Sequence, residues 1–382
     1  YPEIREAVSK LCEDFPSEYW RALEKQPPSG SYPTEFIAAL TEAGYLAALI
    51  PEEYGGSGLP LRAAGVILET IHATPCSGAA CHAQMYTMGT LLRHGSEEQK
   101  REYLPKIASG ELRLQAFGVT EPNTGSDTTQ LKTRAERTNS GYRINGQKVW
   151  TSRAAHSDLM LLLARTTPAD QVKKRSDGIS TFLVDLREAV GRGCEVKPID
   201  AMINHNTTEI FFDNLEIPQS ALIGEEGRGF RYILDGMNAE RCLIAAEAIG
   251  TGRWFIERAC EYANERVVFG RRIGENQGVQ FPIARSHARV EAADLMVRKA
   301  TALFDEGLPC GAEANMAKYL AGDACWQAGD VCFDVFGGFA FAREYDVERK
   351  WREARLFRTA PVSENMILNY IGQHVLGLPR SY

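Results

Sequence analysis

The hydrophobic periodicity of the 382-residue chain changes twice, and this change most constrains its fold. Residues up to about 113 carry apolar side chains at helical spacing, with Pro and Gly between the helical segments. From about 114 to 224, short alternating or apolar runs replace them, as is typical of strands. Long helical segments return from about 225. The sequence therefore predicts an α+β chain with domains at 1–113, 114–224 and 225–382.

The first domain is predicted to be α-helical. Residues 35–47, 61–72 and 79–92 have apolar positions at helical spacing. Ser96 is typical of a helix N-cap, and two glutamates follow it in the first turn, where the helix dipole favours negative charge. We therefore expect a further helix to begin there.

The middle domain is predicted to be an antiparallel, β-barrel-like domain. Residues 131–136 alternate with period two, and 159–164 and 179–184 are apolar runs of strand length. Asn145 and Gly146 lie between two strand-like runs and predict a tight hairpin turn. Because no helix of crossover length separates these strands, antiparallel connections are expected.

The last domain is predicted to consist of long helices. The segments 229–267, 279–304, 312–335 and 347–375 keep a helical texture and are separated by short breaks. Long helices with short connections favour an antiparallel arrangement, so we expect a C-terminal four-helix bundle.

The charge balance argues against nucleic acid as a partner. Lys plus Arg total 43 and Asp plus Glu total 50, which gives a formal net charge of −7. Phosphate binding needs a basic face instead. No apolar run approaches the roughly 20 residues that a membrane-spanning helix needs. We therefore expect neither a nucleic acid partner nor a membrane span.

Cysteine and histidine usage indicates reduced thiols and no metal site. The nine cysteines are odd in number and form no Cys-x-x-Cys, and the seven histidines are dispersed. Acidic residues among the first 20 positions argue against a signal or transit peptide there. The expected compartment is the cytoplasm for a bacterial chain. For a eukaryotic chain that has lost a targeting segment it is the mitochondrial matrix or the peroxisome.

One dense polar loop is a candidate ligand site. Phe117–Asp127 (FGVTEPNTGSD) gathers hydroxyls, an amide and a glycine around one proline. Backbone N–H groups and hydroxyls in such a loop can bind an anion or the polar edge of a ring. A plain polar connector is the alternative, and composition alone favours it. The chain has no Rossmann fingerprint and no P-loop.

Four motifs together resemble the acyl-CoA dehydrogenase family. The polar loop is similar to the family's V-T-E-P-x-x-G-S-D signature, and Ile144–Ser152 (INGQKVWTS) is similar to its N-G-x-K-x-W-I-T strand. Glu265–Arg271 (ERVVFGR) resembles E-R-x-x-F-G-K/R, and Phe336–Gly338 (FGG) resembles L-G-G. The motifs are collinear with those of the family, so the joint resemblance is much more specific than any one of them.

The resemblance implies FAD as the cofactor. Trp150 would pack against the isoalloxazine ring, Ser152 would hydrogen-bond to its N5 atom, and Ser126 would lie between the flavin and the CoA of the substrate. A ring with apolar faces and polar edges needs an aromatic wall and a hydroxyl at its reacting atom. The other residues expected to contact the flavin here are Phe117, Val119, Thr120, Gly125 and Thr151.

The resemblance also implies contacts with the FAD of a neighbouring subunit. Arg266, Phe269 and Gln277 would bind its adenosine pyrophosphate, and the planar guanidinium group suits phosphate. A flavin shared in this way implies a homotetramer built as a dimer of dimers. Asp334 stands where the family usually has Gln. The remaining expected cofactor contacts are Asp334, Gly337, Gly338, Ser363 and Asn365.

The catalytic base is expected outside the family's commonest position. Most members carry it in a Y-E-G-T loop, and counting on from Glu353 puts Pro361 there. Proline is no base and lacks the N–H that would bind the thioester oxygen, for which the Val362 N–H is a candidate replacement. In the isovaleryl and long-chain branches the base comes from a helix with an E-R-x-x-x-A pattern, which Glu240 matches. We predict Glu240 as the base and Glu364 as its rival.

The surroundings of Glu240 agree with such a role. Leu234–Ile249 is largely apolar, so a carboxylate there costs free energy unless it has a function. Arg241 lies about 100° around the helix and is not expected to neutralise Glu240 directly. In the family Arg241 lies near the CoA and the base, and Met237 is a further expected substrate contact. His205 is predicted to be structural, with a pocket contact as the alternative.

The function implied by the resemblance is α,β-dehydrogenation of a saturated acyl-CoA thioester to trans-2-enoyl-CoA. A buried carboxylate with a raised pKa would remove the α proton. Electrons would pass to an electron-transferring flavoprotein. The alternatives are an acyl-CoA oxidase or flavin monooxygenase on the same fold, and a non-catalytic acyl-CoA- or flavin-binding assembly partner.

Overall fold

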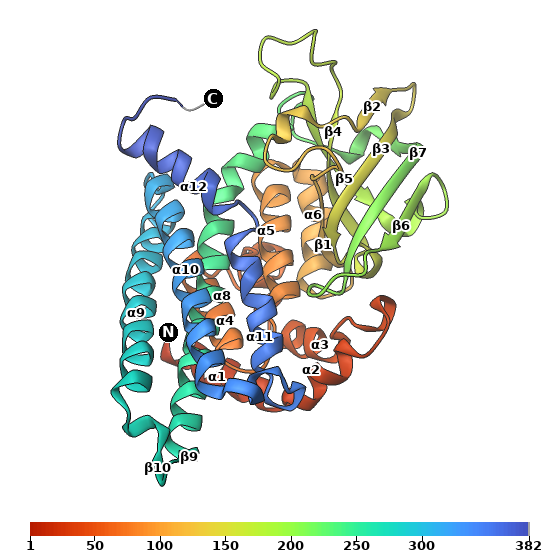
Figure 1. Cartoon of the computed structure of the whole chain (residues 1–382). Coiled ribbons are helices and arrows are strands. Elements are labelled where there is room, and N and C mark those ends of the chain that lie inside the picture. Colours follow the sequence, from red (N-terminus) through yellow and green to blue (C-terminus); the bar gives the residue numbers. More distant parts are fainter. Residues whose placement is uncertain (381–382) are drawn as a thin grey trace. The chain divides into compact units, whose positions relative to one another are not determined.

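The computed structural model describes residues 1–380 of the chain. The structure contains two compact units, each assembled from separate stretches of sequence. Unit 1 contains Tyr1–Ala22, Pro60–Gly78 and the chain from Asn238 onwards, and unit 2 contains Leu23–Leu59 and Ala79–Met237. The predicted α+β fold is confirmed, because helices make up the N-terminal and C-terminal parts of the chain and a sheet the central part (Figure 1).

Unit 1 is built from long helices. α8 (Gly229–Glu265), whose first residues belong to unit 2, is followed by α9 (Gln277–Asp305) and α10 (Gly311–Phe336). α9 and α10 pack along each other (Figure 1), and the buried face of α10 consists largely of the small residues alanine, glycine and cysteine, which permits a close approach. At Gly250 of α8, a Cβ would lie 2.1 Å from a backbone carbonyl oxygen of α4 (Leu61–His72). The other helices with most of their residues in unit 1 are α1 (Pro2–Glu13), α2 (Ser17–Glu24), α11 (Val347–Ala354) and α12 (Glu364–Tyr370).

The last predicted helix, 347–375, is interrupted in the structure. Between α11 and α12 lie a 3-10 turn, η10 (Arg355–Arg358), and an irregular stretch through Pro361, and a π-helical turn, η11 (Ile371–Val375), follows α12. Pro361 explains the break because proline has no N–H and disfavours helical backbone at the residue before it. A separate small hairpin joins α8 to α9. Its strands are β9 (Val267–Val268) and β10 (Arg271–Arg272).

Unit 2 combines a sheet of eight strands with helices. Its longest helix, α5 (Ala79–His94), is followed directly by α6 (Glu97–Ala108). Ser96 caps α6 as predicted, because its hydroxyl accepts from Gln99 N at 3.2 Å and the Gln99 side chain accepts from Ser96 N at 2.9 Å. The short helices are α3 (Thr34–Glu42) and α7 (Leu186–Ala189).

The strands of unit 2 are mostly antiparallel, as predicted, in the order β6-β7-β3-β2-β4-β5-β8. The pairing of β1 with β4 is parallel, however, and so is the single residue pair between β2 and β4. These parallel pairs arise because β1 and β4 are not consecutive in sequence, so the chain can return in the same direction between them. The strands are β1 (Leu114–Gly118), β2 (Arg134–Arg137), β3 (Gly141–Ser152), β4 (Leu159–Arg165), β5 (Ile179–Asp185), β6 (Cys194–Pro198), β7 (Thr207–Pro218) and β8 (Leu222–Ile223).

The predicted hairpin turn at Asn145 and Gly146 is wrong. β3 continues through both residues and pairs with β2 on one side and β7 on the other. The register against β7 shifts between Ile144 and Gly146. Gly146 has φ of 150°, and a Cβ there would lie 2.6 Å from Thr133 Cα. The Asn-Gly pair therefore marks a bulge within a long strand, for which glycine is suited as well as for a turn.

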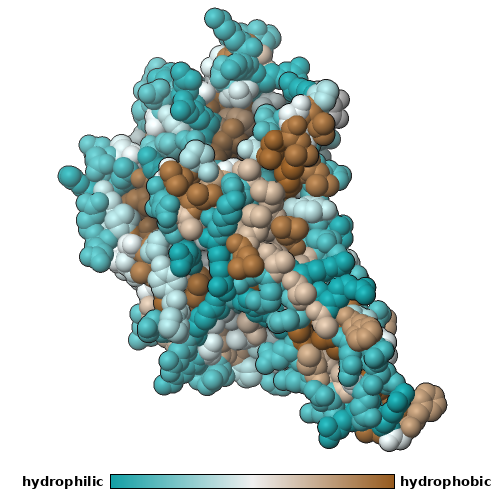
Figure 2. Space-filling model, turned by 90° about the vertical axis from the view of Figure 1, so that its left-hand side faces the viewer, coloured by the Kyte–Doolittle hydropathy of each residue, from teal (hydrophilic) through white to brown (hydrophobic). Residues whose placement is uncertain are grey.

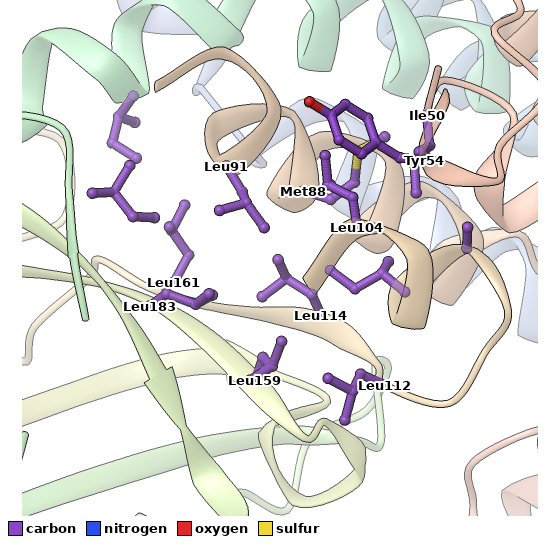
Figure 3. Close-up of a cluster of buried hydrophobic side chains, with 14 of the residues drawn as sticks. Ile50, Tyr54, Met88, Leu91, Leu104, Leu112, Leu114, Leu159, Leu161 and Leu183 are labelled. Carbon is purple, nitrogen blue, oxygen red and sulfur yellow. The ribbon is translucent and has the colours of Figure 1, made fainter. Parts of the chain in front are cut away.

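One core of unit 2 lies between its helices and the sheet. Met88 and Leu91 of α5 belong to the same buried cluster as Leu161 of β4 and Leu183 of β5 (Figure 3). The neighbouring β4 residue Leu162 belongs to a second cluster. Because alternate β4 side chains enter different cores, this strand reads in the sequence as an unbroken apolar run.

The exposed surface is largely hydrophilic on the face shown in Figure 2, with separate apolar patches. In unit 1 the large exposed apolar side chains include Phe269, Phe281 and Leu295. Phe269 lies between β9 and β10, within the third motif. No helix among residues 1–380 is both long and apolar enough to cross a bilayer.

Candidate active site

Two of the four motifs are joined in unit 2 by a buried ion pair. Glu121 of the polar loop faces Lys148 of β3, with Oε1 2.9 Å from Nζ. The Glu121 carboxylate also accepts from the backbone N–H groups of Lys132 (2.6 Å) and Thr133 (2.9 Å). Lys148 in turn donates to the Val119 carbonyl oxygen at 3.1 Å. These bonds fix the path of the polar loop against the sheet.

Burial and pairing have opposite effects on this ion pair. Burial would raise the pKa of Glu121, but Lys148 and the backbone donors outweigh it and lower that pKa. Burial lowers the pKa of Lys148 to about 8, although Glu121 opposes the shift. Neither residue is among the predicted site residues. One feature of the sequence could have pointed to them: each is a charged residue between two uncharged neighbours inside its motif.

The end of β3 presents an aromatic ring and a hydroxyl. The register against β7 shifts before Thr151, and here Trp150 has φ of 60° and is 59% exposed. Ser152 Oγ accepts a hydrogen bond from Asn204 Nδ2 at 2.6 Å. Because this bond uses only an acceptor position of the hydroxyl, the Ser152 hydrogen stays available for another acceptor. Thr151, between the two, has a buried side chain.

The polar loop lies beside this end of β3. The Thr120 carbonyl oxygen accepts from the Val149 N–H at 2.9 Å. Gly125 and Ser126 are exposed, and nothing lies within 4 Å of a Cβ built at Gly125. Within unit 2, the structure thus places an exposed hydroxyl-bearing loop next to the strand that carries the exposed ring. The half-buried loop residues that pack against the core are Phe117 and Val119.

A second group of predicted cofactor residues lies in unit 1. Arg266, Phe269 and Gln277 are exposed around the β9–β10 hairpin, and Phe269 is 100% exposed. The Arg266 guanidinium carbon lies 5.8 Å from the centre of the Phe339 ring, which directly follows the Gly-Gly pair of the fourth motif. The third and fourth motifs therefore meet on the surface. The predicted cofactor residues in and near the fourth motif are also exposed: Asp334, Gly337 and Gly338.

The two candidate bases lie in unit 1 in different environments. Glu240 on α8 is 6% exposed. Glu364, the first residue of α12, accepts from Arg358 Nε at 2.6 Å and from Nη2 at 2.7 Å. This bidentate pair raises the pKa of Arg358. Both Glu364 oxygens are therefore already engaged by one guanidinium group.

Arg241 is held within its own helix. Its Nη1 donates to Asn238 Oδ1 at 3.1 Å. Burial lowers the pKa of Arg241, and the nearby Glu240 charge opposes that shift. Also in unit 1, Lys318 of α10 is buried and interacts electrostatically with both Glu240 and Glu364. The sequence offered no motif that would single out Lys318.

Four further predicted residues have identified positions. Ser363 caps α12, because its hydroxyl accepts from a backbone N–H of the first turn at 3.4 Å, and Asn365 is exposed on that helix. Met237 packs against the core of unit 2. His205 Nε2 lies 3.2 Å from Glu24 Oε1. None of these contacts by itself requires a ligand.

Three family models match consecutive parts of the chain. The acyl-CoA dehydrogenase N-terminal domain matches residues 2–111, the middle domain matches 116–215 and the C-terminal domain matches 227–376. The chain belongs to the acyl-CoA dehydrogenase family. It is an oxidoreductase of that type.

Relatives agree with this chain over almost its whole length. The acyl-CoA dehydrogenase FadE12 of Mycobacterium tuberculosis (strain ATCC 25618 / H37Rv) is 34% identical over 382 residues, which cover 99% of this chain and 96% of FadE12. A solved structure of glutaryl-coenzyme A dehydrogenase with glutaryl-CoA has a TM-score of 0.88 at 31% identity, covering 100% of this chain and 95% of that one. A structure of PigA with FAD and proline has a TM-score of 0.89 at 27% identity, covering 99% and 97%.

FAD is the cofactor of this acyl-CoA dehydrogenase. The residues present fit it. In unit 2, the exposed Trp150 ring offers an apolar face, and the Ser152 hydrogen is available for a ring nitrogen. In unit 1, the exposed Arg266 offers a planar fork for phosphate.

Proposed function

We propose that this chain catalyses the α,β-dehydrogenation of a saturated acyl-CoA thioester, with Glu240 as the catalytic base. The observation that carries the proposal is the contrast between two carboxyl groups of unit 1. Glu240 is buried on α8, whereas Glu364 has both oxygens bound by Arg358. Glu364 would have to leave the guanidinium fork to turn toward a substrate, whereas Glu240 lies in the E-R-x-x-x-A pattern of the branches that carry their base on a helix. Pro361 occupies the position where most members carry their glutamate.

The reaction removes two hydrogens from adjacent carbons of the acyl group. Glu240 takes the α proton on a carboxylate oxygen and becomes the neutral acid. The electron pair left on the α carbon forms the new double bond as the β hydrogen departs with its own electron pair. FAD, when bound, supplies the acceptor for that hydride. The product is the trans-2-enoyl-CoA thioester.

The other predicted residues would bind and orient the reactants. Trp150 would support one face of the flavin, and Ser152 would donate its hydrogen to the flavin N5. Ser126 and Arg241 would contact the CoA thioester, with Met237 near the acyl group. The further flavin contacts of unit 2 are Phe117, Val119, Thr120, Gly125 and Thr151.

A homotetramer built as a dimer of dimers is part of the proposal. The fully exposed Phe269 and the exposed Arg266, three residues before it in the sequence, are the kind of surface that a second copy with its FAD would cover. Gln277 would join them at the adenosine pyrophosphate. The remaining contacts proposed for FAD are Asp334, Gly337, Gly338, Ser363 and Asn365.

Electrons would leave the reduced enzyme to an electron-transferring flavoprotein. Since FadE12 is bacterial, the proposal includes the cytoplasmic location expected of a bacterial chain.

The test of the function is anaerobic mixing of the FAD-loaded protein with short, branched and long-chain acyl-CoA thioesters. We expect at least one class to bleach the flavin absorbance and yield the enoyl thioester. Absence of bleaching with every class would contradict the proposal. Peroxide formed without an added acceptor would instead identify an oxidase.

Glu240→Gln tests the base and has a matched control on the same helix. Glu247 is also buried on α8, seven residues further on, so Glu247→Gln makes the same chemical change at similar burial. Glu240→Gln should retain FAD and slow flavin reduction by about a thousandfold or more. Glu247→Gln should change thermal stability more than the rate of reduction. Equal rates in Glu240→Gln and the unmodified protein would exclude Glu240 as the base.

A further inference from the structure

Lys318 is an almost completely buried cation in unit 1. It lies on α10 and is 2% exposed. Its Nζ donates a hydrogen bond to the Val362 carbonyl oxygen at 2.8 Å. Lysine is rarely buried without a partner, since its ammonium group loses hydration. Among residues 1–380 it forms no ion pair within 4.0 Å, so the Val362 carbonyl is its direct partner.

The charges around Lys318 come from three elements. α8 contributes Glu240 and Arg241, η10 contributes Arg358, and α12 contributes Glu364. Burial lowers the pKa of Lys318 to about 8, with the two glutamates opposing the shift and the two arginines reinforcing it. Since Glu364 is bound in the fork of Arg358, the ammonium is not needed to neutralise it. Glu240 also favours the charged form of Lys318, and the Val362 carbonyl oxygen accepts its direct hydrogen bond.

The loop that Lys318 holds contains a free backbone donor. Pro361 has no N–H, and in the described part of the chain no hydrogen bond uses the N–H of Val362. Val362 is only partly buried. A backbone N–H held in place by its neighbouring carbonyl is a preorganised donor, which is what a developing enolate oxygen requires.

We infer that Lys318 is a positioning residue of the dehydrogenation site: its ammonium group fixes the Val362 backbone so that the Val362 N–H binds the thioester oxygen. This inference rests on the proposed function. It assigns to the Val362 N–H the hydrogen bond to the thioester oxygen that Pro361, which has no N–H, cannot donate. It also explains why a buried lysine lies beside the helix that carries the proposed base.

Lys350 provides a matched control. It is 0% exposed in unit 1, and its Nζ donates to two backbone carbonyl oxygens, those of His72 (3.1 Å) and Cys76 (3.2 Å). Burial lowers its pKa to about 8 as well, but the charged groups that act on it do not include Glu240. Lys350 thus has the burial and bonding of Lys318 without its place near the proposed base.

The experiment compares Lys318→Met, Lys350→Met and Val362→Pro in the FAD-loaded full chain. Val362→Pro removes the proposed donor and leaves Lys318 intact. It replaces a loop residue whose N–H forms no hydrogen bond among residues 1–380. With an acyl-CoA that bleaches the flavin, Val362→Pro should lower kcat about a hundredfold and Lys318→Met at least about tenfold, with KM changed less than about threefold. Lys350→Met should leave kcat within about twofold.

The pH profile separates a positioning role from a purely structural one. In the unmodified protein, kcat should fall as pH rises through about 8, because the neutral Lys318 amine then donates a weaker, uncharged hydrogen bond to the Val362 carbonyl oxygen. Lys318→Met should lack this fall, and Lys350→Met should keep it. A kcat within threefold of the unmodified protein in Val362→Pro, or an unchanged alkaline limb in Lys318→Met, would overturn the inference. If Lys318→Met does not fold, Val362→Pro decides alone.

Failure of this inference and failure of the proposed function give different results. If the unmodified protein bleaches with an acyl-CoA and Val362→Pro does so at the same rate, the function stands and only the role of the Lys318–Val362 contact is lost. If the unmodified protein bleaches with none of the thioesters, the function fails and this inference fails with it.

Discussion

Asn204 donates a hydrogen bond from Nδ2 to Ser152 Oγ at 2.6 Å, at the end of the strand that carries Trp150. Asn204 has φ of 53°, a left-handed backbone conformation that asparagine tolerates better than most residues. Asn204 therefore suits this backbone position and also orients the Ser152 hydroxyl, which we propose donates to the flavin N5.

Asn204→Gly should slow flavin reduction without disturbing the loop. Glycine keeps the positive φ at no steric cost but removes the amide donor. Loss of one hydrogen bond of about 1.4 kcal/mol corresponds to about a tenfold slower anaerobic reduction by the acyl-CoA, measured by stopped-flow absorbance. Asn214→Gly is the control, since Asn214 on β7 also has a positive φ, of 51°. It should leave the rate unchanged.

Ser152→Ala tests whether Asn204 acts through Ser152. Both substitutions remove the same hydrogen bond, so the double variant should be little slower than Ser152→Ala alone. Effects that multiply in the double variant would show that Asn204 acts independently.

Glu121→Ala should destabilise the chain strongly, because it leaves the Lys148 ammonium buried without its carboxylate. Removing one partner of a buried pair typically costs about 3–5 kcal/mol in the free energy of unfolding, which urea titration measures. The double variant Glu121→Leu/Lys148→Met should recover part of that loss. Glu216→Ala breaks an exposed pair with Arg143 (2.7 Å) and should cost less than about 1 kcal/mol. Equal losses at the two positions would contradict this account.

Periodicity predicted those elements whose signal is local. The helix at 61–72 matches α4 at both ends, and the Ser96 cap is present because its partner, Gln99, is three residues away. The Asn145–Gly146 hairpin failed because a glycine with positive φ serves a bulge as well as a turn, and only the partner strand decides between them. Proline chemistry indicates a break in the helix at Pro361. The helical periodicity on both sides of Pro361 instead predicted one continuous helix.

The residues of the candidate site show the same contrast between local sequence patterns and contacts with distant segments. The family motifs lead to Trp150, Ser152 and Glu240 because each lies inside a contiguous pattern. Asn204 and Lys318 have partners 52 and 44 residues away in the sequence, so no local pattern connects Asn204 to Ser152 or Lys318 to Val362. Such positioning contacts depend on how distant segments fold together and become visible only in three dimensions.

Lys350→Met should change how stability depends on pH. Burial lowers the pKa of Lys350 from 10.5 to about 8. Between these values the unfolded chain binds more protons at this group than the folded chain does. Its destabilising contribution is therefore complete below pH 8 and disappears as pH rises toward 10.5. The variant lacks this contribution. Its stability relative to the unmodified protein should fall by about 3 kcal/mol between about pH 7 and pH 11, measured by urea midpoints. A difference independent of pH would contradict the assignment.

Glu364→Gln tests the rival candidate base directly. Glu364 and Arg358 are partly exposed, so losing their ion pair should cost about 1 kcal/mol and lower the thermal midpoint by a few degrees. Because Arg358 already occupies both Glu364 oxygens, we expect anaerobic flavin reduction by the acyl-CoA to stay within about threefold of the unmodified protein. A thousandfold loss in Glu364→Gln, together with an unaffected Glu240→Gln, would place the base on α12. It would also mean that Glu364 accepts the proton on an oxygen lone pair that the Arg358 fork leaves free, or after that fork opens.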